Sequence, residues 1–463
     1  MQLTSPVFLF LFLPLSLLVL PVIPPRHRKT ALCVLSVLWL LIVNRARPLA
    51  LVQLLFLPLL VSLLSALPDR MPRVRAAVGI VVPLAALTAT RLLAEYAPFP
   101  YVYPTGLTVM TLGAVSIAID RYRGDAPDRE GPLSVLTYLL FFPTMLAGPI
   151  LRYKQFLYVT EHITPNREHF ARGAQLYMLG VIKRVAVVAV LMRAVEEMLS
   201  ISQNSLPPLA LLLLLLMAYA LLYGFVSGTT NMARGLMSIY GMHPPRGQNG
   251  AVPLLLPHRV LYGLLLSLDR YLEDYVTGPL RRHLPARLAR PLSVCLIFVL
   301  TVLFYRTRAE ILLLALPLLL CALLSLRCGH FRRAPRHLFA RMLASVFSIL
   351  CLSILSLGLL LDNPLDVFTL IRTSLTSADH YSFFYLFGAV ADARYLAFCL
   401  VFVATIPISH YHSILLQHIR PRAAFILRVA VSLLICVLFC MTLLYFLPQF
   451  PQYADPVYGS AFS

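Results

Sequence analysis

Charged residues are scarce in this chain. Of its 463 residues only 13% are Asp, Glu, Lys or Arg, whereas 59% are hydrophobic. Soluble globular proteins carry about 25% charged residues, so a mean hydropathy of +0.82 excludes an ordinary soluble protein. No polar stretch is long enough to form a soluble domain. The composition therefore predicts an all-α, polytopic integral membrane protein in which the membrane part is the whole chain.

Long apolar runs recur along the chain, and about 20 apolar residues in a helix suffice to cross about 30 Å of hydrocarbon. The runs of this length are Pro6–Ile23, Pro48–Leu67, Leu206–Val226, Phe339–Leu361, Tyr395–Ile408 and Ala423–Leu447. Shorter runs such as Ala31–Val43 are interpreted as hairpin halves or buried core helices. We expect roughly 10 to 13 spans or half-spans in total.

Acidic residues are few as well, 19 against 39 Lys and Arg, which gives a formal net charge of +20. A nucleic-acid-binding protein collects such charge on one soluble face, but here it lies in short clusters between apolar runs. We therefore expect the lipid bilayer, and no nucleic acid, as a partner. Arg26–Lys29 and Arg327–His337 are expected in the cytoplasm. No basic segment precedes the first apolar run, which argues against a cleaved signal peptide.

Paired cysteines and internal repeats are also lacking. The eight cysteines lie almost entirely in apolar segments and form no Cys-x-x-Cys pair, so we expect neither a disulfide framework nor a zinc site. Transporters built from repeats carry corresponding broken segments in both halves. Because the two halves of this chain do not, the transporter interpretation is disfavoured.

The most informative segment is Phe141–Tyr153, an apolar run that two prolines and a glycine interrupt. Proline removes a backbone donor, so a segment of this kind at membrane depth must be buried in protein or line a cavity. The segment therefore predicts a site. The residues that we assign to it are Pro143, Gly148 and Pro149.

This segment closely resembles the signature of the membrane-bound O-acyltransferase family, in its bacterial branch of alginate O-acetylases and D-alanyl-lipoteichoic acid transferases. Phe8–Leu15 resembles the first helix of the family, and Pro104–Leu107 and Asp120–Gly124 resemble the segment before the signature. Gly180–Arg184 is similar to the Gly-x-x-Lys-Lys helix that follows it. The resemblance thus extends well beyond one motif.

The resemblance implies one helical domain over residues 1–463, with helices around a central cavity. We divide it into N-terminal helices (1–130), a core with the signature and the catalytic region (131–310), and C-terminal helices (311–463). The cavity wall is expected to come from the signature and from Leu264–Arg308.

Tyr223–Ala233 keeps the frame of a further family motif, Tyr-Phe-Asp-Phe-Ser-Gly-Tyr-Ser-Asp-Met-Ala, without its acidic residues. Phe225 and Asn231 stand at the two acidic positions. The resemblance implies that Ser227, Gly228 and Asn231 belong to the cavity.

The family reaction, as the resemblance implies it, is acyl transfer to a hydroxyl whose proton a histidine takes. A hydroxyl needs a base with a pKa near neutrality, which imidazole provides. Both family surroundings of histidine are present, at Leu264–Tyr275 and Thr301–Arg308, but neither contains a histidine. Leu265 stands at the first position and Tyr305, in our best register, at the catalytic one. With a usual pKa of about 10, tyrosine is a poor base.

Other histidines are alternative bases, namely His410, His412 and His258. The first two lie at the end of an apolar span, where we interpret them as an interfacial polar cap. His258 lies two helical turns before Leu265, but the preceding Pro257 is typical of a helix start. The His-x-His pair has no third ligand at metal-ligand spacing, so we expect no metal.

Arg152 and Lys154 directly follow the signature. They are equally consistent with contacts to the phosphates of an acyl donor such as acetyl-coenzyme A and with helix-end cations at the membrane surface.

Two acidic residues near apolar spans, Asp120 and Asp274, are expected to be structural partners of arginines such as Arg121 or Arg270. Arg306 and its neighbour at 308 interrupt a long apolar hairpin. They either bind an anionic ligand or mark a cytoplasmic turn.

We interpret the chain as a degenerate accessory member of a bacterial O-acetylation pathway for envelope glycans. The resemblance implies the inner membrane, partner proteins that modify or export polysaccharide, and no tightly bound cofactor. An active O-acyltransferase with an unrecognised base and a transporter of lipid or glycan precursors remain as alternatives.

Overall fold

The computed structural model describes most of the chain. The described residues are 3–24, 27–45, 47–66, 71–96, 104, 106–125, 131–145, 151–163, 166–201, 206–242, 275, 284–305, 309–327, 338–361, 363–376 and 421–446. Every regular element in these residues is helical, as predicted. The predicted run Tyr395–Ile408 lies outside them.

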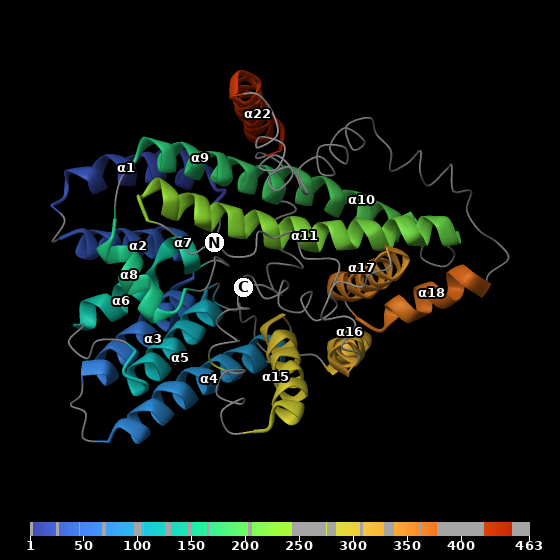
Figure 1. Ribbon diagram of the computed structural model, residues 1–463, viewed down its shortest axis with the longest axis horizontal. Helices are drawn as coiled ribbons and strands as arrows, with labels where there is room; N and C mark the ends of the chain where they lie inside the picture. The colour runs from blue at the N-terminus through green and yellow to red at the C-terminus, as the bar shows by residue number, and fades with distance from the viewer. Residues whose placement is uncertain are drawn as a thin grey trace.

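The helices follow the apolar runs of the sequence (Figure 1). Their bounds are α1 (Leu13–Val22), α2 (Arg28–Asn44), α3 (Pro48–Ala66), α4 (Pro72–Tyr96), α5 (Leu107–Tyr122), α6 (Pro132–Leu140), α7 (Phe142–Met145), α8 (Tyr153–Glu161), α9 (Arg167–Val181), α10 (Val188–Ile201), α11 (Pro208–Ile239), α15 (Ala286–Tyr305), α16 (Ala309–Arg327), α17 (Leu338–Leu360), α18 (Asp366–Thr376) and α22 (Pro421–Met441). Three π-helical segments, Val7–Phe12, Ile182–Val187 and Thr442–Phe446, adjoin α1, join α9 to α10 and extend α22.

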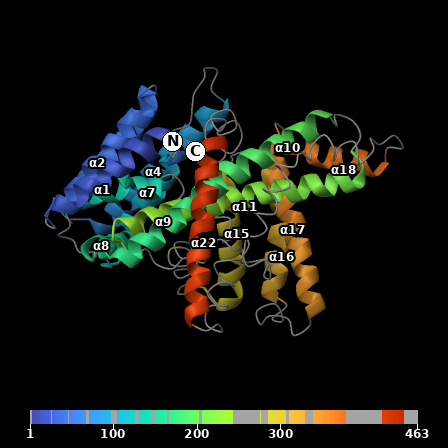
Figure 2. The same cartoon turned by 90° about the horizontal axis from the view of Figure 1, so that it is seen from above.

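The 32-residue helix α11 connects two hydrophobic cores. Its first half packs with α10, α15, α16 and α17 in one core, and its second half packs with α9 and the N-terminal helices in the other. Figures 1 and 2 show α9 and α10 running along α11, with α1–α8 gathered at one end and α16–α18 at the other. The short run at Ala31–Val43 proves to be a helix, α2, that buries Trp39 and Leu40 in the N-terminal core.

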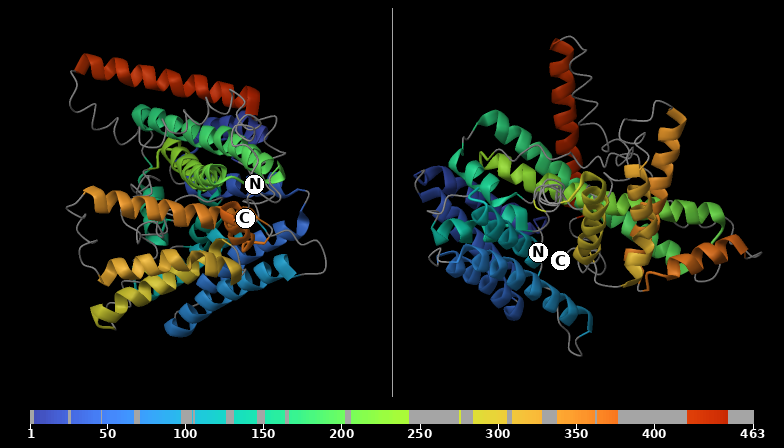
Figure 3. Two further views of the ribbon diagram at one scale, coloured as in Figure 1. Left: turned by 90° about the vertical axis from the view of Figure 1, so that its right-hand side faces the viewer. Right: turned by 60° about the horizontal axis from the view of Figure 1, so that its bottom comes forward.

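Three helical stretches among the described residues are long and apolar enough to cross a membrane, namely Pro72–Ala94, Pro208–Ile239 and Phe425–Leu444. The first and third bury only 17% and 11% of their most apolar window against the rest of the protein. Figure 3 shows α22 at the edge of the molecule, where it packs against α9. Apolar helices with so little protein contact need lipid around them, so the chain is an all-α membrane protein. The number of spans stays a prediction.

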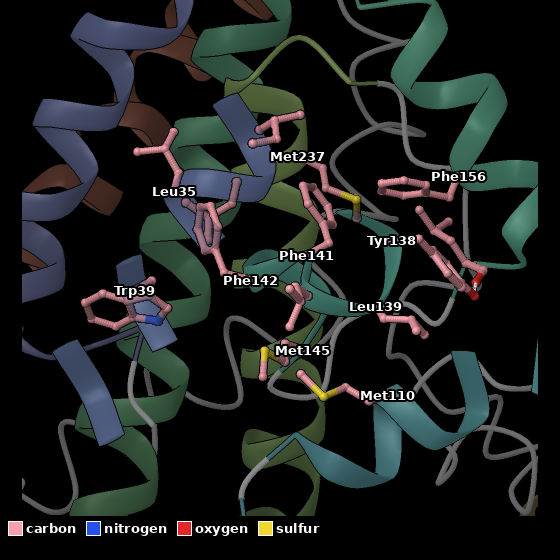
Figure 4. Packing of buried hydrophobic residues seen from close by; sticks show 14 of the residues in the cluster. Leu35, Trp39, Met110, Tyr138, Leu139, Phe141, Phe142, Met145, Phe156 and Met237 are labelled. Atoms are coloured by element: carbon pink, nitrogen blue, oxygen red, sulfur yellow. Dashed lines mark hydrogen bonds between the residues drawn. The ribbon is translucent and has the colours of Figure 1, made fainter. Parts of the chain in front are cut away.

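The predicted break in the signature is confirmed at Phe141. Helix α6 ends at Leu140, Phe141 has ψ of 101°, and the four-residue α7 starts at Phe142. Pro143 has no N–H to donate back toward α6, which favours ending the helix here. Phe141 and Phe142 are fully buried in the N-terminal core (Figure 4). The Phe142 ring packs edge-on against Phe12, with centroids 5.4 Å apart. A broken segment is thus buried in protein, as its composition predicts.

Candidate functional site

A buried carboxylate, Asp120, lies at the C-terminal end of α5 and joins three of the sequence motifs. Its side chain is 0% exposed. The Tyr275 hydroxyl donates to Asp120 Oδ1 at 2.5 Å, and the backbone N–H of Lys154 donates to Oδ2 at 3.2 Å. Lys154 lies at the end of the signature and Tyr275 closes the Leu264–Tyr275 segment. Residues 155 positions apart in the sequence therefore meet at one carboxylate.

Ser116 extends this network one helical turn back along α5. Its hydroxyl lies 2.8 Å from the Tyr275 hydroxyl and accepts a hydrogen bond from the backbone N–H of Tyr153 at 3.0 Å. Because the single Tyr275 proton goes to Asp120, the Ser116 hydroxyl must donate to Tyr275. The result is a directed chain from Tyr153 N–H through Ser116 and Tyr275 to the carboxylate. Hydrogen bonds that are linked in this way polarise and strengthen one another when they are buried.

Basic groups surround this carboxylate. The Arg123 guanidinium lies 5.4 Å from the centroid of the Tyr275 ring, and Lys154 Nζ lies 3.6 Å from the carboxylate of Asp125. Burial raises the pKa of the Asp120 carboxyl above its ordinary value. The hydrogen bonds from Tyr275 and Lys154 and the charge on Arg152 offset only part of that effect. We expected arginines such as Arg121 as structural partners of Asp120. A hydroxyl and a backbone amide donate hydrogen bonds to its carboxylate, and the charge on Arg152 acts on it as well.

The signature also packs against the Pro104–Leu107 motif. Gly106 precedes α5 with φ of +97°, a conformation that favours glycine. A Cβ at this position would lie 2.9 Å from Met145 Cγ and 3.1 Å from the Met145 carbonyl oxygen. A small cavity beside the break is lined by Gly113 of α5, Tyr138 of α6 and Thr144 of α7, among others. The signature and helices α5 and α6 thus enclose one small cavity.

A second cluster joins the motif at Gly180–Arg184 to the motif at Tyr223–Ala233. Lys183 is only 5% exposed, and its Nζ donates to Ser227 Oγ at 2.9 Å. The Arg184 guanidinium carbon lies 3.6 Å from the centroid of the Phe225 ring. Phe225, which stands at the first acidic position of the motif in our reading, thus makes a cation–π contact with Arg184.

The hydroxyl of Ser227 should matter because it accepts from a buried ammonium. We expect Ser227→Ala to lower the free energy of unfolding by about 2 kcal/mol, since a hydrogen bond to a charged group contributes about 1.5–3 kcal/mol. Thermal unfolding in detergent measures the change. Ser200→Ala is the matched control, because the Ser200 hydroxyl is exposed and bonds only to the Glu197 carbonyl among the contacts given for it. Equal effects of the two replacements would contradict the prediction.

The sequence-assigned residues divide between those the structure describes and those it does not. Pro143 is buried in α7, Arg152 and Lys154 flank Asp120, and Ser227 and Gly228 lie buried on α11. Asn231 lies half-buried one turn further along α11, and Tyr305 is the last residue of α15. The remaining assignments lie outside the described residues; they are Gly148, Pro149, His258, Leu265, Asp274, Arg306, His410 and His412.

The hairpin interrupted at Arg306 takes the form of two helices in contact. Helix α15 ends at Tyr305 and α16 begins at Ala309, and the two pack against each other. Residues 306–308 therefore connect consecutive helices. These three residues lie outside the described part of the chain, so the turn and the anion-binding interpretations of Arg306 both stay predictions.

Sequence reasoning missed Ser116 and Tyr275 as site residues. Ser116 lies four residues before Asp120 on a helix, which places both on one face, and this spacing is the signal that could have found it. Tyr275 follows Asp274, the residue that the motif frame singled out.

Comparison with known proteins finds relatives that resemble part of this chain. No family model matches the sequence. A stretch of 139 residues, 30% of this chain, is 32% identical to the probable alginate O-acetylase AlgI of Pseudomonas aeruginosa and covers 26% of that protein. Part of this chain resembles alginate O-acetylases. This finding confirms the resemblance that the motifs predicted.

Two further curated relatives agree with it. The AlgI proteins of Azotobacter vinelandii and Pseudomonas putida are each 31% identical over the same length, which is again 30% of this chain and 27% and 28% of the respective relatives. The matched stretch therefore spans little more than a quarter of these relatives. Activity, substrate and partners of the whole protein remain to be proposed.

Proposed function

We propose that this protein serves the O-acetylation of a bacterial exopolysaccharide as an accessory membrane component that lacks the family base. The observation that carries the proposal is the Asp120 network. It holds together the end of the signature, the segment before it and Tyr275, while Tyr305 and Leu265 stand at the histidine positions. A chain that retains the motifs of the family but lacks its catalytic base is better suited to binding a ligand than to catalysing acyl transfer.

The basic residues beside Asp120 suit an anionic acyl donor. Lys154 is exposed next to the buried carboxylate, and Arg152 lies close enough to lower its pKa. Arginine and lysine bind phosphates, and acetyl-coenzyme A carries several. In this proposal the donor approaches at the Arg152–Lys154 end. Export or modification proteins of the inner membrane supply the polysaccharide and the catalytic base.

Acetyl transfer in proteoliposomes tests this function. The purified full chain is given radiolabelled acetyl-coenzyme A and an alginate oligosaccharide, and label in the oligosaccharide is measured. We expect no transfer above protein-free liposomes, together with saturable binding of acetyl-coenzyme A that Lys154→Gln weakens. We expect no transfer because the chain lacks the family histidine, and general-base catalysis contributes a factor of about 10²–10⁴ to the rate.

Histidine variants decide between the accessory role and an active enzyme. Robust transfer that His258→Ala, His410→Ala or His412→Ala abolishes would contradict the accessory role and identify the base. Tyr305→His, with Tyr305→Phe as its matched control, tests the register of the catalytic position. Flux of a labelled lipid-linked precursor without acetylation would favour the transporter instead.

A further inference from the structure

Helix α18 carries an apolar stripe that the described part of the protein leaves largely uncovered. The side of α18 that packs against the core contains Val367 and Ser374, which are both 0% exposed, and the partly buried Ile371. Phe368 and Leu375 each follow one of the two fully buried residues, and because they lie seven residues apart they share one face. Their side chains are 51% and 68% exposed. The apolar surface of α18 is therefore wider than the part that the protein covers.

The opposite side of α18 is polar. Thr369 and Thr376 are exposed on it, and their hydroxyls donate to the backbone carbonyls of Asp366 and Arg372. Since a helix turns by about 100° per residue, the exposed Arg372 lies between this polar side and the stripe. An arginine at such a border rests its aliphatic stem on apolar surface and extends its charge toward water. This arrangement is typical of helices that lie in the interface of a membrane.

The direction of α18 agrees with such a position. Helices α16 and α17 run in the same direction as α22, which contains the least buried of the three stretches able to cross a membrane (Figure 2). Helix α18 lies across them at the end where α17 terminates (Figure 2). A Cβ at Gly358 of α17 would contact Leu314 of α16 and lie 3.4 Å from the carbonyl oxygen of Pro364, just before α18. A helix that crosses the direction of the spans at their end lies along the membrane surface.

Neighbouring helices mark the depth at which α18 lies. Helix α10 lies at the same end of α16 and α17 (Figure 2), and it exposes Arg193 and Glu196, whose charges require water or headgroups. Leu313 and Leu316, in the first turns of α16, are 54% and 41% exposed and form an apolar surface that requires lipid. Helix α18 thus lies at the level where exposed charge gives way to exposed apolar surface, which is the level of the lipid headgroups.

We infer that α18 lies flat in the membrane interface, with Phe368 and Leu375 in the hydrocarbon of the leaflet at which α17 ends and Arg372 at the lipid phosphates. Continuity with the exposed leucines at the start of α16 favours lipid over a second protein as the cover of the stripe. The charge of Arg372 complements that of the phosphates. This inference does not depend on the proposed function, because no residue of α18 belongs to the Asp120 network.

Tryptophan fluorescence in lipid vesicles tests this position. The full chain with Phe368→Trp or Leu375→Trp is reconstituted into phosphatidylcholine vesicles whose acyl chains carry bromine at a shallow or a deep position, and the two degrees of quenching give the depth of the indole. The wild type supplies the signal of Trp39, its single tryptophan, for subtraction. We expect both indoles at the same depth, about 5–10 Å into the boundary between headgroups and acyl chains. Thr369→Trp is the matched control, because Thr369 is exposed on the polar side next to Phe368. Aqueous acrylamide should quench its indole, and brominated lipid should not.

Three results would overturn the inference. Depths that differ by about 10 Å between Phe368→Trp and Leu375→Trp would show an inclined helix, since seven residues rise about 1.5 Å each along a helix axis. Quenching of all three variants by acrylamide alone would show that water covers the stripe. Protection of both stripe variants from bromine and from acrylamide would show that a protein surface, here a second copy of the chain, covers it. The replaced side chains are exposed, so each indole fits without displacing a core residue, and circular dichroism verifies the helical fold of each variant.

Discussion

Gly180→Val is expected to abolish the folded state, because the backbones of α9 and α11 touch at this glycine. A Cβ at Gly180 would lie 2.6 Å from the backbone nitrogen of Met232 and 2.7 Å from the carbonyl oxygen of Gly228. Backbone atoms of a packed helix cannot rotate away, so the two helices must separate. Overpacking costs about 1–3 kcal/mol where side chains can adjust, and we expect more than 3 kcal/mol here. That is a large share of the about 5–15 kcal/mol by which proteins are stable.

A second glycine at the contact between α9 and α11 provides an independent test of the same prediction, and an exposed glycine elsewhere provides the control. Gly235 on α11 faces Tyr177 and Gly173 of α9, where a Cβ would lie 2.6 Å from the Tyr177 nitrogen, so Gly235→Val should be equally severe. Gly131→Ala is the matched control, because a Cβ there meets no atom within 4 Å. The single tryptophan, Trp39, is 1% exposed and reports unfolding by fluorescence. Melting of the Gly180 variant within a few degrees of the Gly131 variant would show that the crossing is not tight.

This crossing also shows how far the sequence predicts the fold. Apolar runs predicted most of the described long helices, since burial and membrane insertion depend on composition over some 20 residues. Pro143 predicted the break at Phe141 because the loss of one N–H acts locally. Motif frames selected Gly180 and Gly228, but only the structure explains their size, since backbone contact between helices has no signature in spacing alone.

The Asp120 network illustrates what sequence reasoning could not supply. Asp120, Lys154 and Tyr275 lie in three motifs that were treated separately, and no periodicity relates positions 34 or 155 residues apart. An arginine was the expected partner because charge pairing is the common solution for a carboxylate near a membrane. The structure adds a hydroxyl and a backbone amide, which donate hydrogen bonds to Asp120. The donors that reach a buried carboxylate depend on which segments the tertiary fold brings next to it, and the sequence around Asp120 does not contain that information.

Removing the Asp120 carboxylate is the second change with a large expected effect. Asp120→Ala leaves the buried N–H of Lys154 without this acceptor and takes away the hydrogen bond of the Tyr275 hydroxyl, and each buried group left unsatisfied costs about 1–3 kcal/mol. We expect a loss of roughly 3 kcal/mol in the free energy of unfolding. Asp120→Asn keeps the shape and one acceptor oxygen, so its loss should be smaller. Thermal unfolding followed by Trp39 fluorescence measures both.

The pH dependence of these variants distinguishes a buried carboxyl from an ordinary structural aspartate. Burial raises the pKa of Asp120 in the folded protein, so the folded state binds the proton more tightly than the unfolded state. Its contribution to stability is therefore present below the ordinary carboxyl pKa of about 3.9. It is lost as the pH rises from there through the raised value. The unfolding free energy of the wild type should fall across this window relative to that of Asp120→Asn.

Glu161→Gln is the control for this titration, because Glu161 is exposed and pairs with Lys29 only at 3.9 Å. If the pH profiles of the wild type and Asp120→Asn run parallel, the carboxylate keeps its charge at little cost, and Arg152 and the donors from Tyr275 and Lys154 outweigh its burial. Asp120 would then be an ionised carboxylate that nearby cations stabilise. A phosphate-bearing acyl donor at Arg152 and Lys154 would have to compete with Asp120 for these positive charges.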